Sequence, residues 1–354
     1  MYLKKRALRI YPLYAVSIIA ALIVSKATYS YLTIAGNFTF LQVLFCDVIL
    51  SNGPLFTLHY EILFYLLFIA VSMYKLNPVK VMVFSILIGF LNYFIYPAFG
   101  AVIITAYCFS FSFWLLGLVV VKYCKVDTVV KISNTKLVSF LFLISAIPYL
   151  NELNTLIYSS SIKWLGHELV FTYDGNINNW FKMTFNVYDF AYIPFCFMAI
   201  VLFTNRTFKL KNIIFWILQL VPLFTLWSIY YREGGIPVAK MIFPISCYGV
   251  SMILCFTNLK VIEYASGKLI NFLIWMGGIS YGTYIIHSPI LFFFSRIHFF
   301  SGSHLTFLVR MVLYFFTTFV AAYLLEKKFH VWIVSLINNK LSFRHPKPIE
   351  VINQ

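Results

Sequence analysis

Charged residues are scarce in this sequence and make up only 11% of its 354 residues. A soluble domain usually carries about 25% charged residues, so a chain this poor in charge is not an ordinary soluble protein. Apolar residues account for 62% of the chain, and aromatic residues for 20%. This composition predicts a membrane domain whose apolar side chains face lipid, with tyrosine and tryptophan at the membrane–water interfaces.

The sequence also lacks a cysteine pairing motif. Its six cysteines are scattered, mostly within apolar runs, and no two of them form a CxxC pair. A disulfide framework is therefore not expected, and no metal site is expected either. We expect the cysteines to pack as small apolar residues.

Ten apolar segments predict membrane-spanning helices, each of which needs roughly 20 mostly apolar residues. They cover residues 10–26, 56–74, 79–97, 101–121, 137–150, 187–203, 212–230, 237–257, 270–296 and 305–325. The predicted fold class is therefore all-α, a polytopic transmembrane helical bundle, with a membrane domain over 1–335 and a short cytoplasmic tail over 336–354. The longest break, 151–186, holds His167, Glu168 and Asp174 and is predicted to be an extramembrane loop or an interfacial hairpin.

Acidic residues are few, which gives the chain a formal net charge of +16. In a soluble protein this charge would suggest a nucleic-acid partner. Here the basic residues lie mostly in short loops between apolar runs, so no nucleic acid is expected. If the N-terminus is cytoplasmic, ten spans place 20 of the 27 Lys and Arg residues in cytoplasmic segments. The positive-inside rule then predicts that both termini are cytoplasmic.

Glu61 is an ionisable residue within a predicted span. An Asp, Lys or Arg at the centre of a span costs roughly 2.5–3.5 kcal/mol on insertion scales, so such residues are candidates for function. Thr57, Glu61 and Tyr65 recur every four residues and share one helix face, whereas His59 lies about 200° around the helix from Glu61. Glu61 is predicted either to orient a base or a substrate, or to anchor a neighbouring helix. His59 is predicted to be an interfacial histidine near the outer edge.

His287 is the second candidate, because imidazole transfers protons near neutral pH. One stripe of its predicted helix carries Ser280, Thr283, Tyr284 and His287. Gly278 and Gly282 form a GxxxG pattern that permits close helix contact. Pro289 follows the histidine and frees a backbone carbonyl. The alternative is that His287 only holds two helices together.

Two further features are basic. Arg310 lies about two turns inside the last predicted span, where it either pairs with an anion or extends to the outer face. A cluster of Lys4, Lys5, Arg6 and Arg9 precedes the first span. This cluster is either a topology signal or a phosphate clamp at the cytoplasmic mouth.

Four motifs of this sequence, in order, resemble those of the membrane-bound acyltransferase-3 family, which includes O-antigen and exopolysaccharide O-acetyltransferases. They are YLKKRALRIYPLY at 2–14, PLFTLHYEILFYLLF at 54–68, GGISYGTYIIHSPI at 277–290 and YLLEKKF at 323–329. Together they extend over nearly the whole chain. Each motif is loose alone, so the resemblance depends on their common order.

The resemblance implies an acyltransferase of a bacterial inner membrane. Such proteins take an acyl group, usually acetyl from acetyl-CoA in the cytoplasm, and transfer it to a sugar or polysaccharide hydroxyl across the lipid bilayer. It implies that Lys5, Arg6 and Arg9 bind the CoA phosphates and that Glu61 and His287 are catalytic. The substrate path would be lined by Thr57, Ser280, Tyr281 and Tyr284.

Family members begin with two more spans, which carry the histidine regarded as the catalytic base. This sequence starts on the basic motif, so we expect either a late start of the reading frame or a truncated, inactive member. Another function class stays open: a polysaccharide flippase or polymerase-like transporter also has ten or more spans and a basic bias.

Overall fold

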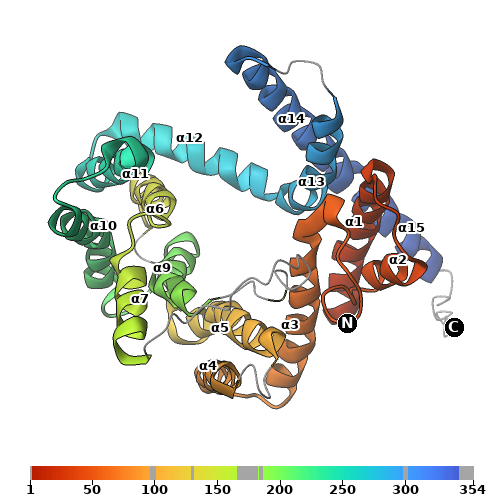
Figure 1. Ribbon diagram of the computed structural model, residues 1–354, viewed down its shortest axis with the longest axis horizontal. Coiled ribbons are helices and arrows are strands. Elements are labelled where there is room, and N and C mark those ends of the chain that lie inside the picture. The colour runs from red at the N-terminus through yellow and green to blue at the C-terminus, as the bar shows by residue number, and fades with distance from the viewer. Residues whose placement is uncertain are drawn as a thin grey trace, which may run out of the picture. The chain divides into compact units, whose positions relative to one another are not determined.

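The computed structural model describes residues 2–95, 101–128, 131–165, 182, 186–297 and 302–342, and these are predominantly helical (Figure 1). The helices are α1 (Tyr2–Val24), α2 (Tyr31–Phe38), η1 (Leu50–Leu55), α3 (Phe56–Met73), α4 (Pro78–Ile95), α5 (Val102–Tyr123), α6 (Asn134–Ala146), α7 (Glu152–Leu165), η2 (Val187–Tyr192), α9 (Ile193–Phe203), α10 (Lys211–Glu233), α11 (Val238–Phe256), α12 (Lys260–Gly277), α13 (Ser280–Arg296), α14 (His304–Leu324), the π-helical turn η3 (Leu325–Phe329) and α15 (His330–Ser342). Two short strands, β1 (Lys125–Val126) and β2 (Arg206–Thr207), pair antiparallel.

The chain forms two compact units. Unit 1 comprises Met1–Tyr65 and Ile274–Gln354, and unit 2 comprises Leu66–Leu273. The helix α15 continues to Ser342, past the predicted start of the tail at 336. The predicted loop residues His167, Glu168 and Asp174 lie outside the described residues. The neighbouring segment of that loop forms the helix α7.

The predicted membrane character is confirmed, because seven helices within the described residues are long and apolar enough to cross a membrane. The pair α12 and α13 makes an eighth if it is one broken span, and Asn134–Ala146 and Val187–Phe203 are shorter apolar helices. Each predicted segment therefore coincides with an apolar helix, while the number of ten spans stays a prediction. The segment 270–296, predicted as one span, is divided between α12 and α13, so it is not one straight helix.

The chain between α12 and α13 bends by 69°. Two adjacent glycines, Gly277 and Gly278, lie at the end of α12, where glycine weakens a helix because it has no side chain and a large conformational freedom. The amides of Gly278 and Ile279 bond back to the carbonyls of Trp275 and Met276 at 3.0 Å, which closes the last turn of α12. A new helix then begins at Ser280.

Within unit 2, α4 has the polarity expected in lipid, with apolar residues outside and polar residues inside. Phe84, Leu87 and Leu91 are exposed, whereas Ser85 and Asn92 are buried against α5. The Asn92 amide donates to the carbonyl oxygen of Ala101 at 2.7 Å and to the Thr105 hydroxyl at 2.8 Å. The Ser85 hydroxyl donates to the carbonyl oxygen of Cys108 at 2.8 Å. Small and polar residues hold membrane helices together in this way, because lipid supplies no hydrophobic force between helices.

A second polar contact joins α6, α10 and α11. The hydroxyls of Ser139 and Ser251 each donate to the other residue's carbonyl oxygen at 2.8 Å. The Gln219 side chain donates to Ser139 at 3.3 Å and lies 3.1 Å from Ser251. All three side chains are fully buried, so their hydrogen bonds remove the cost of leaving polar atoms unpaired.

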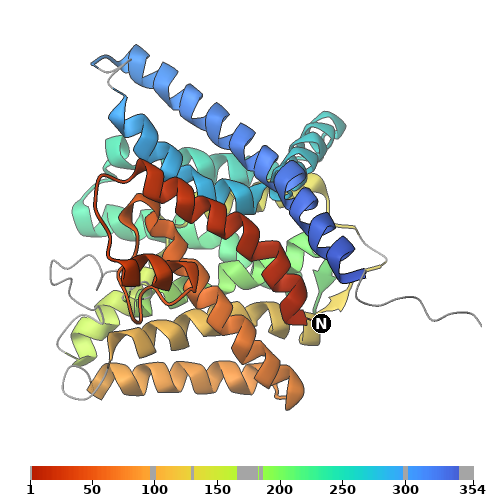
Figure 2. The same ribbon diagram turned by 90° about the vertical axis from the view of Figure 1, so that its right-hand side faces the viewer.

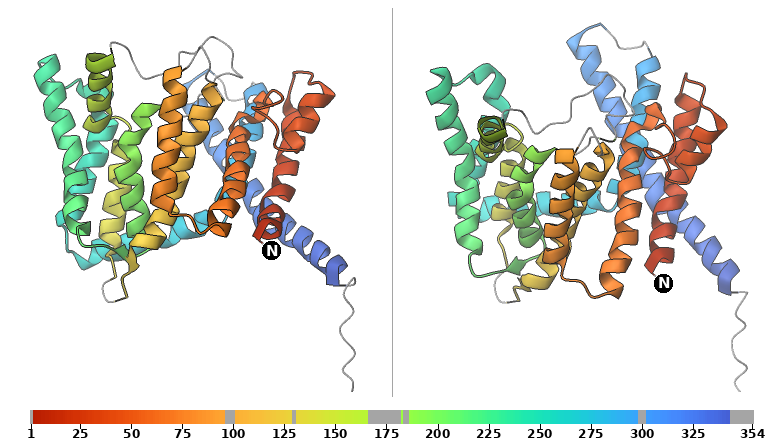
Figure 3. Two further views of the ribbon diagram at one scale, coloured as in Figure 1. Left: turned by 90° about the horizontal axis from the view of Figure 1, so that it is seen from below. Right: turned by 60° about the horizontal axis from the view of Figure 1, so that its bottom comes forward.

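Four Lys- and Arg-rich loops of unit 2 lie at one end of its helices (Figure 3). The Tyr123 hydroxyl bonds to Asn77 at 3.1 Å, which joins the end of α5 to the α3–α4 loop. The strands β1 and β2 join the loops that follow α5 and α9. Glu263, near the start of α12, accepts from the amide of Asn134 at 2.8 Å. The sequence placed these four loops on one side of the membrane, and the fold places them at one end of the unit.

In unit 1, α1 packs with α13 and η1 around a buried apolar cluster (Figure 2). The cluster includes Leu13, Tyr14, Ile18, Leu58 and Ile285. The helix α13 also packs against α14, which continues through η3 into α15. These contacts bring together segments from both ends of the sequence, and all four motifs contribute residues to them.

A proline in α1 and a proline in α13 each leave one backbone carbonyl without its helical hydrogen bond. Pro289 has no N–H for the carbonyl of Ile285, and the Asn52 side chain donates to that carbonyl at 2.9 Å instead. Pro12 likewise leaves the carbonyl of Leu8 without its helical donor, and His330 Nε2 lies 3.1 Å from it. Since a carbonyl only accepts, His330 Nε2 is the donor here. The carbonyl that Pro289 was predicted to free is thus that of Ile285, two residues before His287.

Candidate functional site

Glu61 lies half-buried on α3 and accepts a short hydrogen bond from the Tyr65 hydroxyl one turn later. The Tyr65 ring is almost fully buried. The predicted shared face of these two residues is therefore confirmed, since residues four apart in a helix are neighbours. A hydrogen bond to a carboxylate is stronger than one between neutral groups, so Tyr65 fixes the position of the Glu61 side chain.

Arg6 connects the basic N-terminal motif to this pair. Its guanidinium carbon lies 5.0 Å from the centre of the Tyr65 ring and 5.4 Å from that of Tyr2, within the range of cation–π contact. Tyr65 therefore lies between a guanidinium on its face and a carboxylate at its hydroxyl. Lys5 and Arg9 are exposed, and in the described part of the chain neither pairs with a carboxylate.

Tyr284 of α13 contacts the same face of α3. Its hydroxyl forms short hydrogen bonds with the Thr57 hydroxyl and the carbonyl oxygen of Pro54. The charge of Glu61 acts electrostatically on the hydroxyls of Tyr284 and Tyr281. Residues from two motifs more than 200 positions apart thus form one polar group of Thr57, Glu61, Tyr65, Tyr281 and Tyr284, which we call the tyrosine cluster.

Tyr281 extends the tyrosine cluster to α1. Its hydroxyl donates to the carbonyl oxygen of Ile10 at 3.0 Å, one residue after Arg9 in the basic motif. The first and third motifs are therefore bonded directly.

His287 lies one turn beyond Tyr284, with 6.0 Å between the ring centres. Its Nδ1 is 2.6 Å from the carbonyl oxygen of Tyr284. Because a carbonyl only accepts, Nδ1 carries the proton, and the neutral ring then has its lone pair on Nε2. Among the described residues nothing bonds to Nε2, so this nitrogen is able to accept a proton from another molecule.

Three other predicted residues lie elsewhere. Ser280 is exposed and donates to the carbonyl oxygen of Gly277 at 2.9 Å, and among the described residues its hydroxyl has no bond to the tyrosine cluster. His59 is buried within the protein, with Nδ1 at 2.5 Å from the carbonyl oxygen of Phe40, and its place at the membrane interface stays a prediction. Arg310 donates to the carbonyl oxygen of Phe294, near the end of α13, where a cation is favourable.

Glu326 and Asn52 were not predicted as site residues. Glu326 accepts from the amide of Gly282 at 3.0 Å, in the first turn of α13, where a carboxylate is favourable. Asn52 holds the carbonyl of Ile285, two residues before His287. Glu326 had a signal in the sequence, because it is an acidic residue beside an apolar run. Asn52 had none beyond its place before Pro54.

Cys46 lies in the loop between α2 and η1. Burial, and then the neighbouring Asp47 carboxylate, raises the pKa of this thiol above its ordinary value. A thiol with a raised pKa carries little thiolate at neutral pH and is a poor nucleophile. The Cys46 side chain instead packs against Gly36, where a Cβ would lie 2.3 Å from its sulfur.

No family model, curated protein or solved structure matches the chain. The resemblance described above therefore depends on the sequence motifs alone.

Proposed function

We propose that this protein is a membrane O-acyltransferase that moves an acyl group, normally acetyl, from cytoplasmic acyl-CoA to a hydroxyl of a cell-surface polysaccharide or lipid-linked sugar. It would lie in a bacterial inner membrane with ten spans and both termini in the cytoplasm. The proposal is supported by the order of the four motifs and by the way the first three meet in unit 1.

One observation carries the proposal. The tyrosine cluster joins the second and third motifs, and Arg6 of the first motif lies on the Tyr65 ring of this cluster. Ionisable groups are costly among membrane helices, and this group gathers a carboxylate, a guanidinium and three phenols within one unit. Such an arrangement suits a path for a polar substrate better than a purely structural contact does.

His287 is the proposed base. Its Nε2 takes the proton of the sugar hydroxyl while the hydroxyl oxygen attacks the thioester carbonyl carbon, which forms the new C–O bond. The C–S bond then breaks, and the departing CoA thiolate receives a proton from the imidazolium. The carbonyl of Tyr284 holds Nδ1 through both steps.

The phosphates of CoA are assigned to Lys5, Arg6 and Arg9. Lys5 and Arg9 are exposed at the start of α1, so their charges are accessible to a soluble ligand. Arg6 is partly buried by its two tyrosines and holds a fixed position. Arginine binds phosphate with two parallel hydrogen bonds, which suits a pyrophosphate donor.

Labelled acetyl-CoA supplied to membrane vesicles that contain the protein and the host lipopolysaccharide tests this function. We expect label in the glycan fraction, and a decrease of about 100-fold or more in His287→Gln, because general-base catalysis contributes that much. Glu61→Gln is expected to reduce transfer as well. The control is His304→Gln, since His304 is exposed at the start of α14. Equal transfer by His287→Gln and His304→Gln, with both proteins folded, would contradict the assignment.

A further inference from the structure

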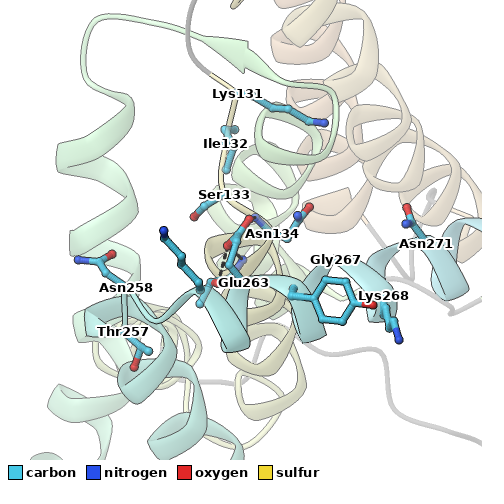
Figure 4. Close-up of a pocket in the computed structure, with 13 residues that line it drawn as sticks. Lys131, Ile132, Ser133, Asn134, Thr257, Asn258, Glu263, Gly267, Lys268 and Asn271 are labelled. Carbon is cyan, nitrogen blue, oxygen red and sulfur yellow. Dashed lines mark hydrogen bonds between the residues drawn. The ribbon is translucent and has the colours of Figure 1, made fainter.

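Unit 2 contains a pocket of about 750 Å³ that the proposed reaction does not use (Figure 4). It lies between the loop that leads into α6, the turn between α11 and α12, and one side of α12. Its polar lining includes Lys131, Asn258, Lys260, Glu263, Lys268 and Asn271. This volume is within the range of roughly 300–1,000 Å³ that is usual for small-molecule sites.

The single carboxylate of the lining, that of Glu263, already accepts hydrogen bonds from the start of α6. One oxygen of Glu263 accepts from the amide of Asn134 at 2.8 Å, and the other accepts from the amide and the hydroxyl of Thr135 at 3.0 and 2.6 Å. These amides begin α6, whose N-terminal partial positive charge offsets the carboxylate. Figure 4 shows the Glu263 side chain directed to the start of α6. Glu263 is therefore held by α6, and among the described residues it forms no ion pair with the lysines of the pocket.

The three lysines of the lining have no acidic partner within the described residues. The two ion pairs found there join Lys211 to Asp127 and Arg232 to Glu152. Lys268 instead lies 4.7 Å from the centre of the Tyr264 ring, which it contacts through its ammonium group. Three unpaired ammonium groups and two side-chain amides around one cavity favour an anion with several oxygen atoms.

The position of the pocket within unit 2 indicates which kinds of anion reach it. It lies at the end of unit 2 where the basic loops gather, which in a helical membrane protein is the membrane surface. The helix α12 exposes large apolar side chains beside the pocket, among them Val261 at 78% and Trp275 at 52%. A helix with basic and apolar sides at the surface of a bilayer binds anionic lipids.

We propose that this pocket binds a phosphate group, carried either by an anionic lipid headgroup at the membrane surface or by a soluble phosphorylated compound. The lysines of the lining, Lys131, Lys260 and Lys268, supply the positive charge that attracts the phosphate, and a side-chain amide beside the bound group donates to its oxygens. The site is separate from the proposed acyl-CoA site, and its occupation is measurable whether or not the protein is an acyltransferase.

Full-length protein, purified free of lipid in a nonionic detergent, provides the test. Native mass spectrometry measures the binding of phosphatidylglycerol and of phosphatidylcholine, and calorimetry measures the binding of ADP and inorganic phosphate. The first variant replaces Lys131, Lys260 and Lys268 with Gln. The matched control replaces Lys75, Lys80 and Lys209, which are exposed basic-loop lysines outside the pocket, so the net charge falls equally. A further variant, Asn271→Asp, adds a negative charge and keeps every lysine.

If each lysine contributes as basic residues do near an anionic surface, the pocket variant binds about tenfold or more weakly, and the control changes less than about threefold. Loss of phosphatidylglycerol binding in the pocket variant and in Asn271→Asp identifies a lipid headgroup. Loss of ADP or phosphate binding in these variants identifies a soluble ligand. The proposal is overturned if no anion binds to the native protein, or if the control variant weakens binding as much as the pocket variant.

Discussion

The contact between α13 and α14 depends on the absence of a side chain at Gly282. A Cβ at this position would lie 3.0 Å from the carbonyl oxygen of Ala322, 3.3 Å from the Cα of Ala322 and 2.9 Å from the Cγ of Glu326. Two of these atoms are backbone, so they move only if α14 itself moves. We therefore expect Gly282→Ala to separate the two helices and to weaken the hydrogen bond from the Gly282 amide to Glu326.

The magnitude follows from two opposing effects. Overpacking of a close contact costs about 1–3 kcal/mol, while alanine in place of helical glycine gains about 0.5–1 kcal/mol. The difference is a net loss of up to about 2.5 kcal/mol, and each kcal/mol lowers Tm by roughly 2–4 °C for a unit of this size. Thermal unfolding in detergent, followed by size-exclusion chromatography, measures this decrease.

Gly277→Ala is the matched control, because Gly277 belongs to the same unit and a Cβ there would have nothing within 4 Å. It is expected to leave Tm unchanged or to raise it slightly. If Gly282→Ala unfolds at the same temperature as Gly277→Ala, the two helices do not approach as described. The GxxxG interpretation of this segment would then be wrong.

Two further substitutions test single buried hydrogen bonds by thermal unfolding. Asn52→Ala leaves the carbonyl of Ile285 unpaired and is expected to lower the free energy of unfolding by about 1–3 kcal/mol. Pro289→Ala restores a helical donor for that carbonyl, so the double variant is expected to recover part of this stability. Fully additive effects of the two substitutions would contradict this expectation. Asn92→Ala is expected to lower Tm by removing three hydrogen bonds at the start of α5. Leu91→Ala, at a residue 64% exposed, is expected to change Tm little, and an equal decrease would show that α4 does not face α5 with Asn92.

The sequence predicted the helices of this fold well, because an apolar run in a membrane has to satisfy its own backbone. It failed at the junction of α12 and α13. Hydropathy averaged over 270–296 is high throughout, and Gly277 and Gly278 do not lower it enough to mark a break. The bend of 69° arises from two residues, and a pattern that averages over about twenty residues does not detect it.

Within the candidate site, sequence spacing predicted contacts inside a helix but not between helices. The pair Glu61 and Tyr65 follows from positions four apart on α3. The contact of Thr57 with Tyr284 does not follow from sequence spacing, since it depends on how α13 lies against η1 and α3. The predicted stripe of Ser280, Thr283, Tyr284 and His287 does lie within one helix, but Ser280 is the first residue of α13 and its hydroxyl bonds to the carbonyl oxygen of Gly277.

The prolines show where sequence reasoning ends. Pro12 and Pro289 each predict a carbonyl without a helical donor, because proline has no N–H. In a membrane such a carbonyl needs a donor from the protein, since lipid offers none. The identity of the donor comes only from the fold: His330, more than 300 residues from Leu8, bonds to one carbonyl, and Asn52 bonds to the other. Each donor belongs to a different segment from the carbonyl that it bonds. At each proline, therefore, a hydrogen bond between two segments of unit 1 replaces a hydrogen bond within a helix.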